Sequence, residues 1–383
     1  MRVVPVNCVK ENSSLAKHIY DADGRILLKK GTCLTRGLIK RILDIGIHTI
    51  YINDEYSNNE IEDIIKPEVR LRAVKGIKDT FESFSKYSKQ KNMNTSSVKE
   101  KQFLKERDKH IEVLGDVSKS IVDEILASKS TLINLVDIKT MDSYTYQHCV
   151  NVAVLSIILG VEFGFNTKQL VDLCTGALLH DIGKVFIPKE ILTKPGKLTD
   201  EEYEIIKEHP TKGYQYLDGN RDISAHSKMI ILQHHEKIDA TGYPRQIDGF
   251  KIHTMAKIVA IADVYDAITS DRPYRKALSP SEAVEFIMAG AGRHFDFEMA
   301  QTFVRKVIPY PEGTLVKLSN GEVGVVEEVK PNFPLRPKVK VIKQKAVNIE
   351  MQSIDLINEN NIIIEGIQYE APNLSIPHYL KNR

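Results

Sequence analysis

The chain has 383 residues, more than one typical domain, and this length predicts two or three domains. Its 42% hydrophobic residues are ordinary for a globular protein, and 53 Lys and Arg residues nearly balance 51 Asp and Glu residues, so net charge gives no reason to expect DNA, RNA or a membrane surface as a partner. The four cysteines form no CxxC pair and no secretory signal is visible, which predicts a cytoplasmic protein without a disulfide framework.

Residues 1–54 are predicted to form a small α+β unit. The pattern over 19–28 is typical of two strands around an Asp-Gly turn. Thr35 is placed to cap an amphipathic helix that ends at Gly46, and a strand follows over 48–52. No catalytic pattern is visible here, so two interpretations remain open: a sensing or docking module with a protein partner, or a folded spacer.

Residues 55–128 are charged and poor in glycine and proline. They predict two helices around a break over 92–97, and we interpret them as a helical linker with a solvated face. The alternative is a dimerising stalk, which would make the protein a homodimer.

Residues 129–311 show helical periodicity almost throughout and predict the main helical domain. The third of its helices opens on the capping box from Thr199 to Glu202 and is expected to end before Pro210. The longest apolar run, over 150–165, is too short and too polar to span a membrane. The expected helices cover 143–163, 167–180, 199–209 and 255–269.

Residues 312–383 are predicted to form a small β appendage. Two short apolar segments, 315–318 and 323–326, flank an Asn-Gly pair and predict a hairpin. Further strands are expected over 339–342 and 362–368. The predicted fold class is therefore mainly α, a helical bundle with a small α+β unit before it and a small β appendage after it.

Seven imidazole and carboxylate side chains stand out in the helical domain, and such groups are the usual ligands of hard-to-borderline divalent metals. Asp181 follows His180 at the end of an apolar helix, and its two oxygens could bridge a pair of metals. Asp263 lies within an apolar helix, where an unpaired carboxylate would be costly. The seven residues are His148, His180, Asp181, His209, His234, His235 and Asp263.

These ligands predict a two-metal site that hydrolyses a phosphodiester. If Asp181 is counted twice, each metal receives about four contacts, which leaves positions for a water activated between the metals and for a phosphate oxygen. The complete set argues against a purely non-catalytic scaffold. His226, His253 and His294 lack this context and are predicted to be structural.

Four sequence strings carry a resemblance to a known family. HDIGK begins at His180, HHEKIDATGYP at His234, ADVYDAITSDRPYRKALSP at Ala262, and YTYQHCVNVA at Tyr144. In this order they resemble the HD-GYP family of HD phosphohydrolases, over about 130–310. The resemblance implies a helical HD-type bundle that hydrolyses cyclic di-GMP to pGpG and onward to GMP, with two divalent metals, iron or manganese.

The resemblance also implies roles for individual residues. His148, His180, Asp181 and Asp263 would hold one metal, and His209, His234 and His235 the other, with Asp181 shared. Asp181 and Lys184 would be the catalytic pair, Lys184 steadying the phosphate. The substrate contacts would be Lys184, Tyr243, Arg272 and Arg275.

Two positions depart from the family pattern. Tyr144 stands where some members have a glutamate that could hold a third metal, so two metals are expected. Ala240 replaces a common glycine and would be strained if the position requires positive φ. Asp266, one turn after Asp263, could orient a ligand histidine or an arginine. The alternatives to cyclic di-GMP hydrolysis are action on another cyclic dinucleotide or nucleotide, and a weakly catalytic sensor or docking module.

Overall fold

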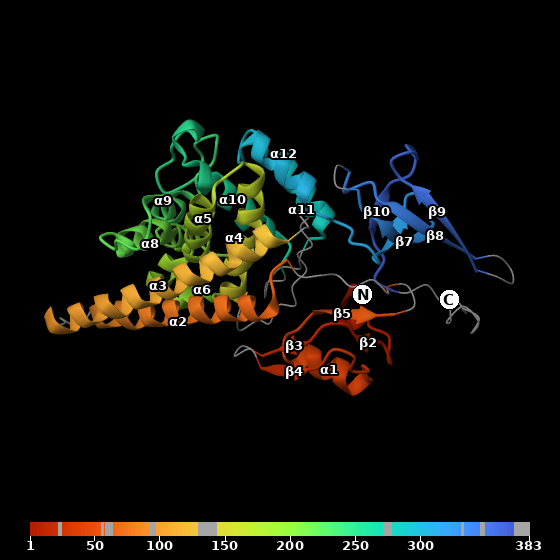
Figure 1. The fold of residues 1–383 in the computed structure, drawn as a ribbon, viewed down its shortest axis with the longest axis horizontal. Helices are drawn as coiled ribbons and strands as arrows, with labels where there is room; N and C mark the ends of the chain where they lie inside the picture. The colour runs from red at the N-terminus through yellow and green to blue at the C-terminus, as the bar shows by residue number, and fades with distance from the viewer. Residues whose placement is uncertain are drawn as a thin grey trace.

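The computed structural model describes residues 1–21, 25–54, 57, 64–91, 97–128, 144–270, 278–330, 333–344 and 349–370. Along the chain these residues form an N-terminal α+β unit, a helical bundle and a C-terminal β-sheet (Figure 1). The predicted fold class, mainly α with a small unit at each end, is confirmed.

The N-terminal unit has the predicted hairpin, helix and returning strand. Thr35 caps α1 by accepting a hydrogen bond from the backbone N–H of Leu38. The predicted Asp-Gly turn lies outside the described residues. Two further strands, β1 and β2, were not predicted and pair with β5 in the order β1-β5-β2. The elements are β1 (Arg2–Pro5), η1 (Val6–Cys8), β2 (Ser14–Leu15), β3 (Ile19–Tyr20), β4 (Ile26–Leu28), α1 (Arg36–Asp44) and β5 (Thr49–Asn53).

The segment predicted as a linker forms two long helices, α2 (Pro67–Lys91) and α3 (Ser97–Ala127), which lie side by side along the bundle (Figure 1). Their charged residues cover the outer face. Their inner face is buried in the same hydrophobic core as the helices that follow, with Phe84 and Leu114 fully buried. The interpretation as a solvated linker is therefore corrected, because every few residues an apolar side chain joins the core. The predicted break and the boundary near residue 129 fall largely outside the described residues.

The core of the bundle is built from α4 (Tyr144–Glu162), α5 (Thr167–Leu179), α9 (Ala225–Gln233) and α10 (Thr254–Ile268). Helix α4 packs on both α5 and α10, and α5 packs on α9. The remaining elements surround this group. They are η3 (Ile182–Phe186), α6 (Lys189–Leu192), α7 (Asp200–Ile206), α8 (His209–Leu217), η4 (Gly249–Lys251), α11 (Pro280–Ala289) and α12 (Phe297–Lys306).

The predicted helix over 199–209 is shorter than expected. Its capping box at Thr199 is present, but α7 ends at Ile206 and α8 begins at His209, with Pro210 in its first turn. The prediction that Pro210 follows a helix end was therefore incomplete. Proline is tolerated in a first turn because no backbone N–H is needed there. Consequently His209 lies at a helix start.

The C-terminal sheet contains five antiparallel strands in the order β10-β6-β7-β8-β9. The predicted hairpin is confirmed as β6 and β7, whereas β9 was not predicted. Buried Arg2 joins this sheet to the N-terminal unit, since it donates to Asp54 at 2.7 Å and to the carbonyl of Tyr369 at 3.0 Å. The strands are β6 (Leu315–Leu318), β7 (Val323–Glu328), β8 (Lys338–Gln344), β9 (Ile349–Asp355) and β10 (Ile364–Ile367).

Within the described part of the chain, no helix has the length and apolar character needed to cross a membrane.

Candidate metal centre

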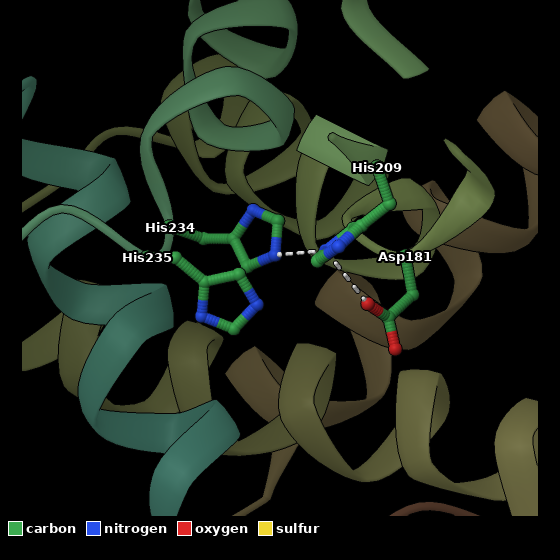
Figure 2. A group of neighbouring side chains, drawn as sticks. All are labelled: Asp181, His209, His234 and His235. Carbon is green, nitrogen blue, oxygen red and sulfur yellow. Dashed lines mark hydrogen bonds and ion pairs between the residues drawn. The ribbon is translucent and has the colours of Figure 1, made fainter. Parts of the chain in front are cut away.

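The structure brings the seven predicted ligand side chains together inside the helical bundle. They form two clusters, and the potential ligand atoms of each cluster lie within 4.8 Å of one another. Cluster A comes from α4, the end of α5 and α10. Cluster B, drawn in Figure 2, comes from the junction between α5 and η3, the start of α8 and the end of α9. Cluster A consists of His148, His180 and Asp263, and cluster B of Asp181, His209, His234 and His235.

Asp181 faces both clusters. Its Oδ2 atom lies 3.5 Å from Nε2 of His180 and 4.0 Å from Nε2 of His148, whereas its Oδ1 atom lies 3.4 Å from Nε2 of His209. One carboxylate therefore presents one oxygen to cluster A and the other to cluster B. This is the geometry that a shared ligand requires.

Close backbone contact fixes the position of Asp181 relative to α8. A Cβ atom added to Gly183 would lie only 1.9 Å from the carbonyl oxygen of His209 and 2.7 Å from the backbone nitrogen of Gly213. Only glycine permits this approach, since real Cβ atoms do not come so close to backbone. Gly183 therefore allows η3 to lie against the start of α8, which places Asp181 beside His209.

Three of the histidines are oriented by carbonyl groups of their own helical turn. The Nδ1 atoms of His180 and His209 lie 2.7 Å and 2.8 Å from the carbonyl oxygens three residues earlier. Nδ1 of His234 lies 3.0 Å from the carbonyl oxygen of Ile231. A carbonyl can only accept, so each Nδ1 carries the proton, and each Nε2 presents its lone pair to the site.

His148 is oriented differently, because its Nδ1 lies 2.7 Å from Oδ2 of Asp266 rather than near a carbonyl. On the other side of the ring, Nε2 lies 3.1 Å from Oδ1 of Asp263. Of the two partners that the sequence allowed for Asp266, the structure shows a histidine, and the role of His148 as a ligand stays a prediction. Carboxylate partners of this kind fix the ring and increase its basicity as a ligand.

Burial sets the protonation of cluster B. Desolvation lowers the pKa of His209 to about 3 and that of His235 to about 4, and it holds the pKa of His234 well below its usual value. For Asp181, burial acts to raise the pKa, but Lys184 and the neighbouring histidines lower it well below the usual value. At neutral pH the cluster offers neutral imidazoles and a carboxylate, the states in which these groups bind metals.

In cluster A, the charge of a protonated His148 is compensated by the neighbouring carboxylates of Asp263 and Asp266. Burial acts to lower the pKa of His148, but hydrogen bonds with Asp263 and Asp266 raise it to about 10. The pKa of Asp263 is lowered, because the interactions with His148 and His180 outweigh its burial. A metal that binds at this cluster would replace the proton on Nε2 of His148.

The donor set fits metal ions. Nε2 of His180 and Oδ1 of Asp181 are buried and have no hydrogen-bond partner among the described residues. Nε2 of His209 and Nε2 of His234 face each other at 3.3 Å, and both are acceptors because their Nδ1 atoms carry the protons (Figure 2). Buried acceptors left in this arrangement are costly, and a cation at each cluster would satisfy the acceptors of that cluster.

The loop after His235 is held by its own backbone contacts. Buried Glu236 accepts hydrogen bonds from the backbone N–H groups of Arg245 at 2.7 Å and Ile247 at 3.3 Å. A Cβ atom on Gly242 would lie 2.5 Å from the carbonyl oxygen of His235, so glycine is required there. The loop therefore folds back onto the histidine pair.

The structure shows the backbone angle of Ala240 and the position of the Tyr243 ring in this loop. Ala240 adopts φ of +60°, so the position does require positive φ, and alanine is strained there. The ring of Tyr243 stacks on His235, with 4.6 Å between centroids and 29° between planes. One face of Tyr243 is therefore used to support a potential ligand, which leaves its predicted substrate contact to its other face or its edge.

Lys184 lies beside Asp181, with its Nζ atom 2.5 Å from Oδ2, the oxygen that faces cluster A, and about a third of its side chain is exposed. It can therefore reach both the carboxylate and solvent. Arg272 and Arg275 lie outside the described residues, as does the side chain of Tyr144. Their predicted roles stay predictions.

Sequence reasoning overlooked two buried polar residues around the centre. Asn151 donates to Oδ1 of Asp266 at 2.9 Å, and Glu236 holds the loop after the histidine pair. The available signal was position: Asn151 interrupts an apolar run, and Glu236 directly follows two predicted ligands. A polar residue in such a place must be hydrogen-bonded if it is buried.

Comparison with known families agrees with this architecture. Residues 122–299 match the family described as HD domain, and residues 315–370 match the family described as KOW domain associated with HD domain. Bd1817, an HDG"Y"P protein from Bdellovibrio bacteriovorus, has a similar fold, with a TM-score of 0.50 at 18% identity over 79% of this chain and 97% of that protein. Residues 122–299 of the helical bundle are thus an HD domain.

Similar sequences define the family further. The chain is 43% identical over 242 residues to cyclic di-GMP phosphodiesterase PA4108 from Pseudomonas aeruginosa, covering 62% of this chain and 58% of that protein. It is 30% identical over 232 residues to cyclic di-GMP phosphodiesterase PdeB from Borreliella burgdorferi, covering 60% and 61%. The chain spans less than two thirds of either relative's length. It belongs to the HD-GYP family.

A relative with a different printed substrate is also similar. The 3'3'-cGAMP-specific phosphodiesterase 1 from Vibrio cholerae is 36% identical over 190 residues, which cover 46% of this chain and 42% of that protein. Family membership therefore leaves a choice between substrates.

Proposed function

We propose that the chain is a metal-dependent phosphodiesterase that hydrolyses cyclic di-GMP to pGpG, and that it binds two divalent metals, iron or manganese. The observation that carries this proposal is the pair of adjoining clusters with Asp181 facing both. The ligands, seven imidazole and carboxylate groups, suit such metals and contain no thiolate. The relatives' substrate supports the choice of cyclic di-GMP.

The seven residues are proposed to bind two metals as follows. His148, His180, Asp181 and Asp263 would hold one metal, and His209, His234 and His235, with Asp181, the other. Bound divalent cations supply an acidified water and positive charge on the phosphoryl oxygens.

Around the metals, the protein would place the neutral histidines of cluster B and the ammonium group of Lys184. The buried histidines of cluster B remain neutral at physiological pH because burial lowers their pKa values. Lys184, partly exposed and already paired with Asp181, can turn its ammonium group toward a phosphate oxygen. Tyr243 keeps His235 in place by stacking on it, and we propose that Arg272 and Arg275 bind the dinucleotide.

The proposal is tested with purified protein from which metals have been removed. The protein is reloaded separately with Mn²⁺, Fe²⁺ under anaerobic conditions, or Mg²⁺, and each form is incubated with cyclic di-GMP, 3'3'-cGAMP and bis(p-nitrophenyl) phosphate. We expect turnover of cyclic di-GMP to pGpG with the first two metals, and two metal equivalents per chain.

Other outcomes would identify the alternatives. Turnover of 3'3'-cGAMP alone would assign a different cyclic dinucleotide. Binding of cyclic di-GMP without hydrolysis, by a protein that holds both metals, would assign a sensor. Absence of bound metal would refute the proposed centre itself.

A further inference from the structure

A chain of hydrogen bonds leads from helix α2 to the metal centre. Nη1 of Arg70 donates to Oδ1 of Asn151 at 2.7 Å, and Nδ2 of Asn151 donates to Oδ1 of Asp266 at 2.9 Å. The other oxygen of Asp266 accepts from Nδ1 of His148 at 2.7 Å. Asn151, Asp266 and His148 are all buried, at 1%, 4% and 4% exposure.

The chemistry of these groups decides which partner donates in each hydrogen bond of the series. An arginine can only donate, so it must face the amide oxygen of Asn151. The amide nitrogen then faces Asp266, whose ionised carboxylate can only accept. The other oxygen of Asp266 accepts from Nδ1 of His148, which leaves Nε2 of that ring for a metal. If Arg70 is removed, the amide oxygen of Asn151 loses the donor that fixes it, and the hydrogen bond to Asp266 must hold the Asn151 amide without that support.

We propose that Arg70 is a positioning residue that orients His148 for metal binding through Asn151 and Asp266. Arg70 lies in the first turn of α2, outside residues 122–299 that match the HD domain. The affinity of cluster A for its metal thus depends on how the start of α2 is seated. This inference rests on the proposed metal centre. It adds that the first helix after the N-terminal unit takes part in building that centre.

Cluster B provides the internal reference. Its histidines His209 and His234 take their orientation from carbonyls of their own turns rather than from a side-chain relay that starts on α2. Loss of Arg70 should therefore weaken one metal site and leave the other unchanged. A general loss of stability would weaken both.

The experiment titrates metal-free protein with Mn²⁺ by calorimetry and records the electron paramagnetic resonance spectrum of the loaded protein. Arg70→Met should lower the affinity of one of the two sites by about 10- to 100-fold, the range found when outer partners of metal ligands are changed. At limiting Mn²⁺ the spectrum should change from a coupled pair to isolated Mn²⁺. Arg72→Met, an exposed arginine on the same helix, is the matched control and should behave as wild type.

Two further variants sharpen the result. Arg70→Lys keeps one donor and should retain part of the affinity. Adding Arg70→Met to Asn151→Ser, in which the short hydroxyl cannot span both partners, should cause little further loss, because both changes break one chain. If Arg70→Met does not fold, Asn151→Ser alone carries the test.

Several outcomes would overturn the inference while the proposed function stands. These are two unchanged Mn²⁺ affinities in Arg70→Met or in Asn151→Ser, equal losses at both sites, or the same loss in Arg72→Met. A wild-type protein that binds no Mn²⁺ would instead refute the proposed function, since the reference itself would be missing.

Discussion

The two halves of the candidate metal centre, cluster A and cluster B, differ in the support of one histidine. His180 of cluster A bonds to a carbonyl of its own turn, as His209 and His234 of cluster B do, whereas His148 does not. In cluster B, His209 and His234 bond to carbonyl oxygens three residues earlier, so forming the helix end is enough to set the ring. In cluster A, His148 on α4 depends on Asp263 and Asp266 on α10. Local support is robust to changes elsewhere, whereas support between helices makes metal binding sensitive to how the bundle packs.

The largest effect is expected where the halves meet. Asp181→Asn removes the charge that faces both clusters while keeping the size of the side chain. We expect hydrolysis to fall by more than about 100-fold and both metals to be lost or weakened, because even outer partners of metal ligands contribute about 10- to 100-fold. Metal analysis and turnover of cyclic di-GMP measure this.

Asp116→Asn, at an exposed position on α3, is the control and should be unchanged. Full metal content in Asp181→Asn would show that this residue is not a ligand.

A second comparison separates the halves. His209→Ala should remove one metal, that of cluster B, and leave the other bound. Asp266→Asn keeps every proposed ligand but replaces an acceptor of His148, so it should weaken only the metal of cluster A, by about 10-fold or more. Calorimetric titration with Mn²⁺ resolves the two sites. If Asp266→Asn weakened both sites equally, the division into two independently supported halves would be wrong.

The stability of the metal-free protein should depend on pH with opposite signs for the two halves. The pKa values of His209 and His235 are lowered to about 3 and about 4, so the unfolded state binds more protons and stability falls as pH drops from about 6.5 toward these values. The pKa of His148 is raised to about 10, so its contribution is complete below about 6.5 and is lost as pH rises through 10. Urea unfolding across this pH range measures the free energy of unfolding on both sides, the acid limb below about pH 6.5 and the alkaline limb above it.

In this series, His148→Gln should flatten the alkaline limb and leave the acid limb in place. An alkaline limb that persisted unchanged would show that His148 is not the group responsible.

The smallest effect concerns the loop beside cluster B. Ala240→Gly should stabilise the protein by up to about 1 kcal/mol, because left-handed backbone costs alanine about 1–2 kcal/mol, part of which is offset by the greater flexibility of glycine when unfolded. Thermal unfolding measures this. Gly242→Ala is the opposite case, and it should destabilise the loop because a Cβ atom there would collide with backbone. A lower melting temperature for Ala240→Gly would contradict the strain argument.

Local signals in the sequence predicted local features well. The caps at Thr35 and Thr199 and the hairpin from β6 to β7 each depend on a few neighbouring residues. For Ala240 the sequence raised only the condition of a positive φ, and the structure supplied the angle. Short strands such as β1 and the edge strand β9 were missed, because their residues become strands only when a partner strand lies beside them. The role of Pro210 was misjudged because proline both follows helix ends and begins helices.

By itself, the sequence determined which chemistry is available: imidazoles and carboxylates on apolar helices and at their ends, in an order that resembles one family. Only the tertiary structure decided how these groups meet. It placed Asp181 between two clusters through a contact that Gly183 alone permits, and it packed α2 onto the bundle so that Arg70 reaches a ligand's partner. The physical reason is that residue types and helix periodicity are local properties, whereas the distance between side chains far apart in the chain depends on the packing of whole helices.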